Sequence, residues 1–243
     1  MNLVVDIGNN YFKLAVFRNN SLISNASAKN NQFEKHLIKL LSIHNDIEFA
    51  LISNVSDLSL SSAKSIFKQR NIKFFEFTST LKLPFSVNYE SKDTLGNDRL
   101  ALVAACVKSY PNSNNLIIDA GTCITADFIS ETNTYLGGLI SPGIEMRYKS
   151  LNEYTARLPK LKKTDSFKFP ANSTSGSIHT GVVGGVVNEI LGFIEQLQKK
   201  YKNVNVILTG GDAKFLSKTL KITIFANQIF ILEGLNSILN LNK

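Results

Sequence analysis

The chain has 243 residues, of which 44% are hydrophobic and 19% charged, and its formal net charge is +8. This composition excludes a disordered or collagen-like chain, and the length predicts one large domain or two smaller ones with a buried core. Two cysteines are too few for a disulfide framework, the longest apolar run (residues 100–107) is too short to span a membrane, and no signal peptide is evident. We therefore expect a cytoplasmic protein without a membrane partner.

The positive charge is spread along the chain. One local concentration lies in residues 157–168, and it lacks the alternating aromatic residues of a surface that binds single-stranded nucleic acid. We interpret this segment as a solvated surface loop and expect no nucleic-acid partner. The excess charge would equally favour small anionic ligands.

The hydrophobic pattern of the first half predicts alternating strands and helices. We expect strands over residues 3–8, 11–17, 21–27, 48–55 and 73–77. Helices are expected over residues 34–42, 61–70 and 98–110, the second opened by a serine cap and the third ended by Pro111.

The second half repeats the pattern. Strands are expected over residues 116–120, 123–130, 134–140, 204–209 and 221–226, and helices over 144–158, 175–201, 213–220 and 229–241. The segments LVVDIGNN and LIIDAGTC are the same strand-turn-strand unit, with Asp6 and Asp119 at matched positions 113 residues apart. Such a repeat predicts two related α/β domains, over residues 1–113 and 114–243.

Several common catalytic motifs are absent from the sequence, including the P-loop, GxGxxG, GxSxG, CxxC and HExxH. The three histidines are scattered. If the chain is an enzyme, its carboxylates must carry the chemistry.

Asp6 and Asp119 each end a predicted strand and are followed two residues later by glycine. Glycine lets the backbone turn tightly and approach a phosphate, while a carboxylate would act on polyphosphate through a bound cation. Asn9, Asn10 and Thr122 are the polar side chains that could contact phosphate, and Lys13 could add charge. Two ordinary hairpin turns are the alternative.

The segment LGNDR, residues 95–99, combines a tight turn with a helix start. Asp98 could accept a hydroxyl proton while Arg99 holds an anionic group of the substrate. The alternative is a helix-capping aspartate beside a surface arginine.

Other glycines leave their roles open. The glycine-bearing segments at 137–138, 141–143 and 209–212 could contact a ligand or have only a structural role. Gly181, Gly184 and Gly185 in a helical pattern indicate close packing within the chain or against a second copy.

The paired DxG turns resemble those of the acetate and sugar kinase, Hsp70 and actin superfamily. Within it, LVVDIGNN, LGNDR, IDAGT, GGLISPG, TSGSI and LTGG occur in the order found in type III pantothenate kinases. The resemblance implies duplicated RNase H-like (actin-like ATPase) domains with a cleft between them, and a homodimer. It implies phosphorylation of pantothenate by ATP with magnesium and a monovalent cation, potassium or ammonium, as the first step of coenzyme A biosynthesis.

The resemblance also assigns roles to residues of this chain. Asp98 is the catalytic proton acceptor, Asp119 holds potassium and Asp6 lies near magnesium. The implied ATP-binding residues are Asp6, Ile7, Gly8, Asn9, Asn10, Tyr11, Phe12, Lys13 and Thr122. The implied pantothenate-binding residues are Tyr89, Gly96, Asn97, Asp98, Arg99 and Thr174. The family usually has Thr or Ser where Asn10 stands, and often Asn where Ser173 stands.

Two other functions remain open from the sequence. One is a related kinase acting on a sugar or another small hydroxyl compound. The other, from a different class, is a nucleic-acid-binding transcriptional regulator, which the positive charge favours and the absence of a helix-turn-helix pattern disfavours.

Overall fold

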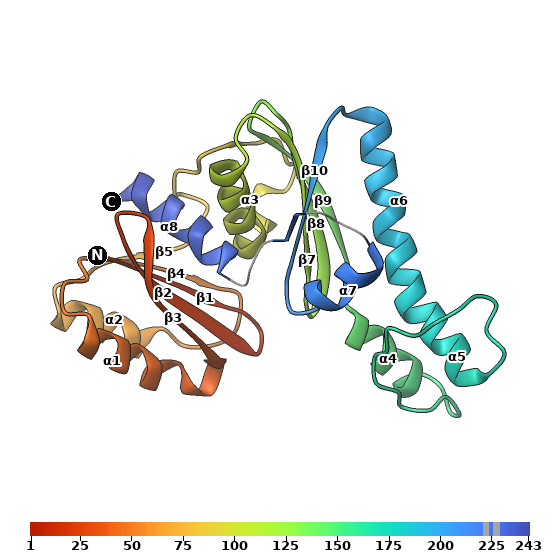
Figure 1. Ribbon diagram of the computed structural model, residues 1–243. Coiled ribbons are helices and arrows are strands. Elements are labelled where there is room, and N and C mark those ends of the chain that lie inside the picture. Colours follow the sequence, from red (N-terminus) through yellow and green to blue (C-terminus); the bar gives the residue numbers. More distant parts are fainter. Residues whose placement is uncertain (221–223, 226–228) are drawn as a thin grey trace. The chain divides into compact units, whose positions relative to one another are not determined.

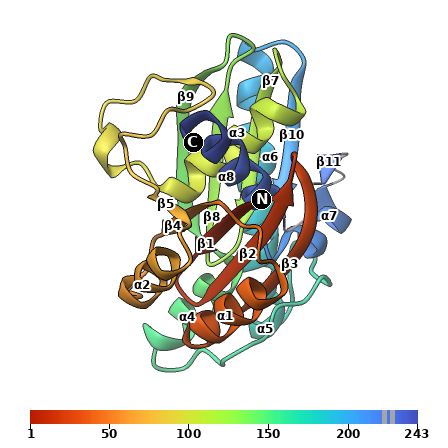
Figure 2. The ribbon, with the colours of Figure 1, turned by 90° about the vertical axis from the view of Figure 1, so that its left-hand side faces the viewer.

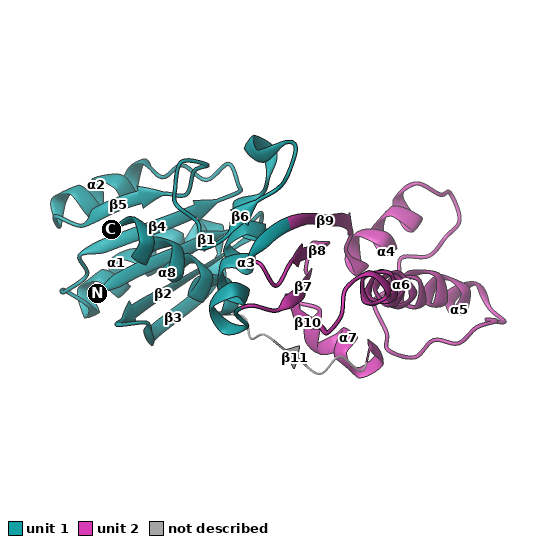
Figure 3. Ribbon diagram, turned by 90° about the horizontal axis from the view of Figure 1, so that it is seen from above, with its two compact units in different colours: residues 1–111, 133–135, 229–243 teal, residues 112–132, 136–228 magenta. Residues whose placement is uncertain are grey.

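The computed structural model describes residues 1–220, 224–225 and 229–243. The chain divides into two compact units (Figure 3). Unit 1 comprises residues 1–111, 133–135 and 229–243, and unit 2 comprises residues 112–132 and 136–228. The predicted boundary at residues 113 and 114 lies close to the change of unit at residue 112, but the closing helix clusters with unit 1 although it follows unit 2 in the chain.

Unit 1 contains a five-stranded sheet in the order β3-β2-β1-β4-β5. Its strands are β1 (Asn2–Ile7), β2 (Tyr11–Arg18), β3 (Ser21–Lys29), β4 (Phe49–Asn54) and β5 (Lys73–Glu76). The first three form an antiparallel meander, whereas β4 and β5 run parallel to β1. The carboxyl ends of β1, β4 and β5 therefore share one edge of the sheet.

Helices cover both faces of this sheet (Figures 1 and 2). α1 (Phe33–Ile43) and α2 (Ser61–Gln69) pack on the face formed by Leu3, Val5 and Ile7 of β1. α3 (Asn97–Ser109) and α8 (Phe230–Asn242) lie on the other face. α1 and α2 each bury an apolar stripe against the sheet, whereas α3 is buried all round over residues 99–106 and packs with α8. This burial is the main source of the helices' stability.

Unit 2 repeats the same topology. Its strands are β7 (Asn114–Ala120), β8 (Cys123–Ile129), β9 (Thr134–Pro142), β10 (Val204–Thr209) and β11 (Ile224–Phe225). The order of the described strands is β11-β10-β7-β8-β9-β6, so β7, β8, β9, β10 and β11 take the places of β1 to β5. The short β6 (Ser86–Val87) pairs with Thr134 and Tyr135, the residues of β9 that cluster with unit 1. The duplicated order confirms the α/β repeat predicted from the sequence.

The core of unit 2 lies between its sheet and the helices α4 (Ile144–Glu153), α6 (Gly185–Lys200) and α7 (Ala213–Leu220). α5 (Thr174–His179) leads through a π-helical turn, Thr180–Gly184, directly into α6. By length and composition alone the combined segment Thr174–Lys200 is apolar enough to cross a membrane, but a buried core helix has the same properties, and 44% of its most apolar window is buried.

Most predicted elements are present, and two details were wrong. The helix predicted to reach residue 158 ends at Glu153, because residues 153–157 are all exposed and offer no apolar face to bury. α2 begins after Leu60 without a side-chain cap, so the predicted serine cap is absent. The strand predicted over residues 221–226 is described only at Ile224 and Phe225, and its remainder lies outside the described residues. The basic segment around residue 160 is an exposed loop, as expected.

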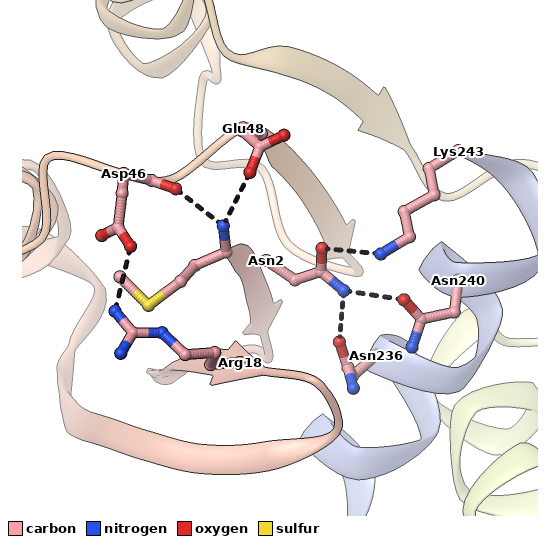
Figure 4. Close-up of polar contacts among 8 residues, drawn as sticks. Asn2, Arg18, Asp46, Glu48, Asn236, Asn240 and Lys243 are labelled. Carbon is pink, nitrogen blue, oxygen red and sulfur yellow. Dashed lines mark hydrogen bonds and ion pairs between the residues drawn. The ribbon is translucent and has the colours of Figure 1, made fainter.

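An asparagine network fastens α8 to the start of β1 (Figure 4). Asn2 donates to Asn236 at 2.8 Å and to Asn240 at 2.9 Å, and the amides of Asn236 and Asn240 both donate to Asn20 in the turn between β2 and β3. Lys243 adds a hydrogen bond to Asn2 at 3.3 Å. Because Asn236 is fully buried, these bonds satisfy polar groups that would otherwise be costly inside the protein.

Candidate functional site

Asp6 lies near the carboxyl end of β1, the central strand of the unit 1 sheet. Its register partners are Lys13 on β2 and Ser53 on β4. Side chains at paired positions project from the same face of a sheet, so the carboxylate lies between an amine-bearing and a hydroxyl-bearing neighbour. Asp6 is only 7% exposed, which places a carboxylate in a largely desolvated position at the strand end.

The turn after β1 is exposed, and hydrogen bonds from Asn30 hold its backbone in place. Asn9 and Asn10 are exposed, and Gly8 N–H closes the turn on the carbonyl of Tyr11 at 3.0 Å. The Asn30 side chain donates to the carbonyls of Gly8 and Asn9, and its backbone N–H donates to Asn10. Sequence reasoning missed Asn30, because its position 20 residues after Asn10 carries no local signal.

The other residues of this segment divide between core and surface. The side chains of Ile7 and Phe12 are buried in the hydrophobic cluster with α1, so only their backbone can contribute to a site. Tyr11 is 56% exposed, and Lys13 is half-buried.

Asp98 lies in the first turn of α3, and the start of this helix is tied to the same sheet edge as Asp6. Asn97 donates its side-chain amide to the carbonyl of Phe77 at 3.0 Å. Phe77 follows β5, and its N–H bonds the carbonyl of Ile52 on β4 at 2.8 Å. The carboxylate of Asp98 accepts the N–H of Arg99 at 2.9 Å and is half-buried, so it is oriented while still accessible.

Arg99 is an interior residue, unlike the surface arginine of the alternative interpretation. It is 5% exposed, and its guanidinium donates to the Tyr135 hydroxyl at 3.0 Å. The Tyr135 ring is fully buried and lies 5.9 Å from the ring of Tyr89. Within unit 1 these contacts bring Tyr89 and Arg99 together through Tyr135, which the sequence did not single out.

In unit 2, Asp119 occupies the position that Asp6 has in unit 1. Its register partners are Thr125 on β8 and Thr209 on β10. The turn after β10 closes on the turn after β7, because Asp212 N–H bonds the carbonyl of Ala120 at 2.8 Å. Gly210 has φ +98°, and a Cβ there would overlap the Asp119 carboxylate.

The turn after β9 also packs against the turn that contains Gly121 and Thr122. Gly143 N–H donates to the carbonyl of Thr122 at 3.1 Å, and a Cβ on Gly143 would overlap the carbonyls of Gly121 and Thr122. The glycines at 143 and 210, whose roles the sequence left open, are therefore required for close approach to the DAGT turn. Three strand-end turns thus surround Asp119 and Thr122.

Thr174 is the first residue of α5 and is exposed. The preceding Ser173 caps the helix by accepting the N–H of Gly176 at 3.1 Å. Asp119, Thr122 and Thr174 all belong to unit 2, whereas Asp6, Tyr89, Asp98 and Arg99 belong to unit 1.

Within the described part of the chain, no group of three His, Cys, Asp or Glu residues could hold a metal ion by itself. Asp6 nevertheless fits magnesium, since this ion is usually held by one or two carboxylates together with substrate phosphates and water. The donor set therefore suits a metal that arrives with a nucleotide.

Residues 2–196 match the type III pantothenate kinases. The chain belongs to this family. A type III pantothenate kinase of Flavobacterium johnsoniae is 44% identical over 236 residues, covering 97% of this chain and 96% of the relative. That of Flavobacterium psychrophilum is 42% identical over the full length of both chains.

As a type III pantothenate kinase, the chain phosphorylates pantothenate with ATP in coenzyme A biosynthesis, and it requires a divalent metal as kinases do. The family therefore favours pantothenate phosphorylation over the two alternative functions.

A solved structure from Campylobacter jejuni, described as a Baf family transcriptional activator, is 25% identical, with a TM-score of 0.64, and the match covers 99% of this chain and 98% of that one.

More distant structures share the fold. A glucokinase from an Antarctic psychrotroph is 13% identical with a TM-score of 0.55, and the match covers 98% of each chain. This likeness concerns the fold alone and agrees with the duplicated actin-like ATPase domains.

Proposed function

We propose that the turn from Asp6 to Lys13 binds the phosphates of ATP and that Thr122 makes a second ATP contact. The exposed turn, its carbonyls engaged by Asn30, supports this assignment, because backbone amides and short polar side chains suit phosphate oxygens. Ile7 and Phe12 contribute through their backbone, while Asn9, Asn10, Tyr11 and Lys13 contribute side chains.

We propose Asp98 as the proton acceptor. The primary hydroxyl oxygen of pantothenate attacks the γ-phosphorus of ATP while its proton passes to the Asp98 carboxylate. The new O–P bond forms as the bond to the β–γ bridging oxygen breaks, which releases ADP and 4'-phosphopantothenate. Phosphoryl transfer asks mainly for positioning and charge stabilisation, which suits a site built from carboxylates and amides.

Pantothenate is positioned by Tyr89, Gly96, Asn97, Arg99 and Thr174 in this proposal. Tyr135 holds the guanidinium of Arg99 in one direction. A fixed guanidinium is a better partner for the pantothenate carboxylate than a mobile one, because less side-chain entropy is lost on binding.

Two cations complete the proposal. Asp6 holds magnesium together with the ATP phosphates, and Asp119 holds potassium or ammonium. Bound cations neutralise the negative charge of the phosphates. The close packing of Gly143 and Gly210 on the DAGT turn supports a fixed position for Asp119.

We also propose a cytoplasmic homodimer. Apart from its chain neighbours and its own helix backbone, a Cβ on Gly181, Gly185 or Gly192 would meet no atom of the described chain within 4 Å. The long helix therefore presents bare backbone on which a second copy of the chain can pack closely. Gly184, by contrast, packs on the Phe167 ring of the same chain.

The observation that carries the mechanism is that Asn97 ties the start of the Asp98 helix to the sheet edge that bears Asp6. We expect Asp98→Asn to lower kcat by about 10²–10⁴-fold, the usual contribution of a positioned general base. Asparagine keeps the oxygen that accepts the Arg99 N–H, so ATP binding measured by calorimetry should change little. Asp93→Asn, at an exposed carboxylate five residues earlier, is the control. Near-normal turnover of Asp98→Asn would refute the assignment.

A further inference from the structure

Ser53 on β4 buries its hydroxyl group without a hydrogen-bond partner among the described residues. The residue is 0% exposed. Buried hydroxyls are nearly always bonded, and an unsatisfied one destabilises the folded state. Alanine would fill this position without an unpartnered hydroxyl, so the Ser53 hydroxyl is free to bond a group that ligand binding brings within reach.

Across the sheet, Ser53 is paired with Asp6. The two residues are register partners on the parallel strands β4 and β1, so their side chains project from the same face at adjacent positions. A rotation of the serine side chain between its staggered rotamers moves the hydroxyl without moving the strand.

The backbone at Ser53 is firmly held, which confines any change to the side chain. Val55 N–H bonds the carbonyl of Ile7 at 3.0 Å, extending the pairing of β4 with β1 past Ser53. The following turn is closed by Asn54, whose amide donates to Leu58 and whose oxygen accepts from Ser56.

The duplicated half repeats the arrangement. Asp119 on β7 has Thr209 on β10 as its register partner in the corresponding parallel pair. Both units therefore place a hydroxyl residue across from the strand-end aspartate, at equivalent positions of the two sheets.

We propose that Ser53 is a positioning residue for Asp6: when magnesium and ATP bind, its hydroxyl donates a hydrogen bond to the Asp6 carboxylate and holds it toward the metal. This rests on the proposed function of Asp6. The bond forms in the loaded state, so its loss weakens binding of the metal-nucleotide pair without weakening the folded protein.

The test compares Ser53→Ala with wild type and with Ser56→Ala as a matched control. Ser53→Ala should raise the Kd of magnesium-ATP about 10- to 150-fold by calorimetry, the range expected for one hydrogen bond to a charged group. ADP binding without magnesium should be unchanged, and the ligand-free melting temperature should equal or exceed that of wild type. Ser53→Thr, which keeps the hydroxyl, should restore much of the affinity.

Ser56→Ala should show the opposite pattern. The Ser56 hydroxyl is already bonded to Asn54 and Leu58, so its loss lowers the melting temperature and leaves magnesium-ATP affinity unchanged. A destabilised Ser53→Ala that binds magnesium-ATP normally would overturn the inference. The variant Asp6→Asn distinguishes a failure of the proposed role of Asp6 from a failure of the role of Ser53. If Asp6→Asn binds magnesium-ATP normally, the proposed site of Asp6 is wrong. If Asp6→Asn fails to bind magnesium-ATP and Ser53→Ala binds it normally, only the role of Ser53 is wrong.

Discussion

The adjacent glycines 210 and 211 offer a test of how the DAGT turn is packed, because the structure predicts opposite effects for the same substitution. Gly210 has φ +98° and its Cβ position overlaps the Asp119 carboxylate and the Ala120 carbonyl. Gly211 has no atom within 4 Å of its Cβ position and is not at positive φ.

The expected magnitudes follow from these two environments. In Gly210→Ala, an unfavourable backbone conformation costs about 1–3 kcal/mol, and overlap with packed neighbours costs a similar amount. We expect the free energy of unfolding to fall by about 2–6 kcal/mol, which lowers the melting temperature by roughly 4–24 °C for a chain of this size. Gly211→Ala should instead stabilise by about 0.4–1 kcal/mol, because alanine reduces the freedom of the unfolded chain.

The assay is thermal unfolding of wild type and both variants, followed by circular dichroism under identical conditions. The melting temperature should fall strongly in Gly210→Ala and rise slightly in Gly211→Ala. If the two variants have the same melting temperature, or if Gly210→Ala has the melting temperature of wild type, the close packing of the turn on Asp119 is refuted.

Two further predictions concern other parts of unit 1. Asn30→Ala removes the side-chain bonds to Gly8 and Asn9, so the KM for ATP should rise several-fold while kcat changes less; an unchanged KM in steady-state assays would contradict the role of Asn30 in shaping the turn. Burial raises the pKa of Glu233 above its ordinary value of 4.5, despite the opposing charge of Lys108. Because the folded state then holds the proton more tightly than the unfolded state, Glu233→Gln should melt above wild type at pH 7, and this advantage should shrink as the pH falls toward 4.5; a pH-independent difference in melting temperature would contradict it.

The sequence predicted what depends on local pattern. Apolar, β-branched segments that lead to Asp6 and Asp119, each followed by a glycine turn, predicted the two strand-turn-strand units, and the duplicated sheet order confirmed the repeat. The helix that begins at Asn97 was also evident, since Pro111 ends its pattern and Asp98 lies in its first turn.

Features that depend on distant contacts could not be predicted. Asn30 clamps a turn 20 residues earlier, Tyr135 holds Arg99 from 36 residues away, and the roles of Gly143 and Gly210 emerge only where three turns meet. The register that sets Ser53 beside Asp6 joins strands separated by more than 40 residues. In each case the signal lies in a pair of positions, which one sequence does not display.

The return of α8 to unit 1 has a consequence for synthesis on the ribosome. The helix buries Phe230, Ile231, Leu235 and Leu239, and its asparagines anchor β1, yet all of unit 2 is translated before it. Domains usually form as they emerge from the ribosome. Here the nascent first unit lacks one of its covering helices until the second has emerged, so an apolar surface of its sheet stays open to chaperones throughout that interval.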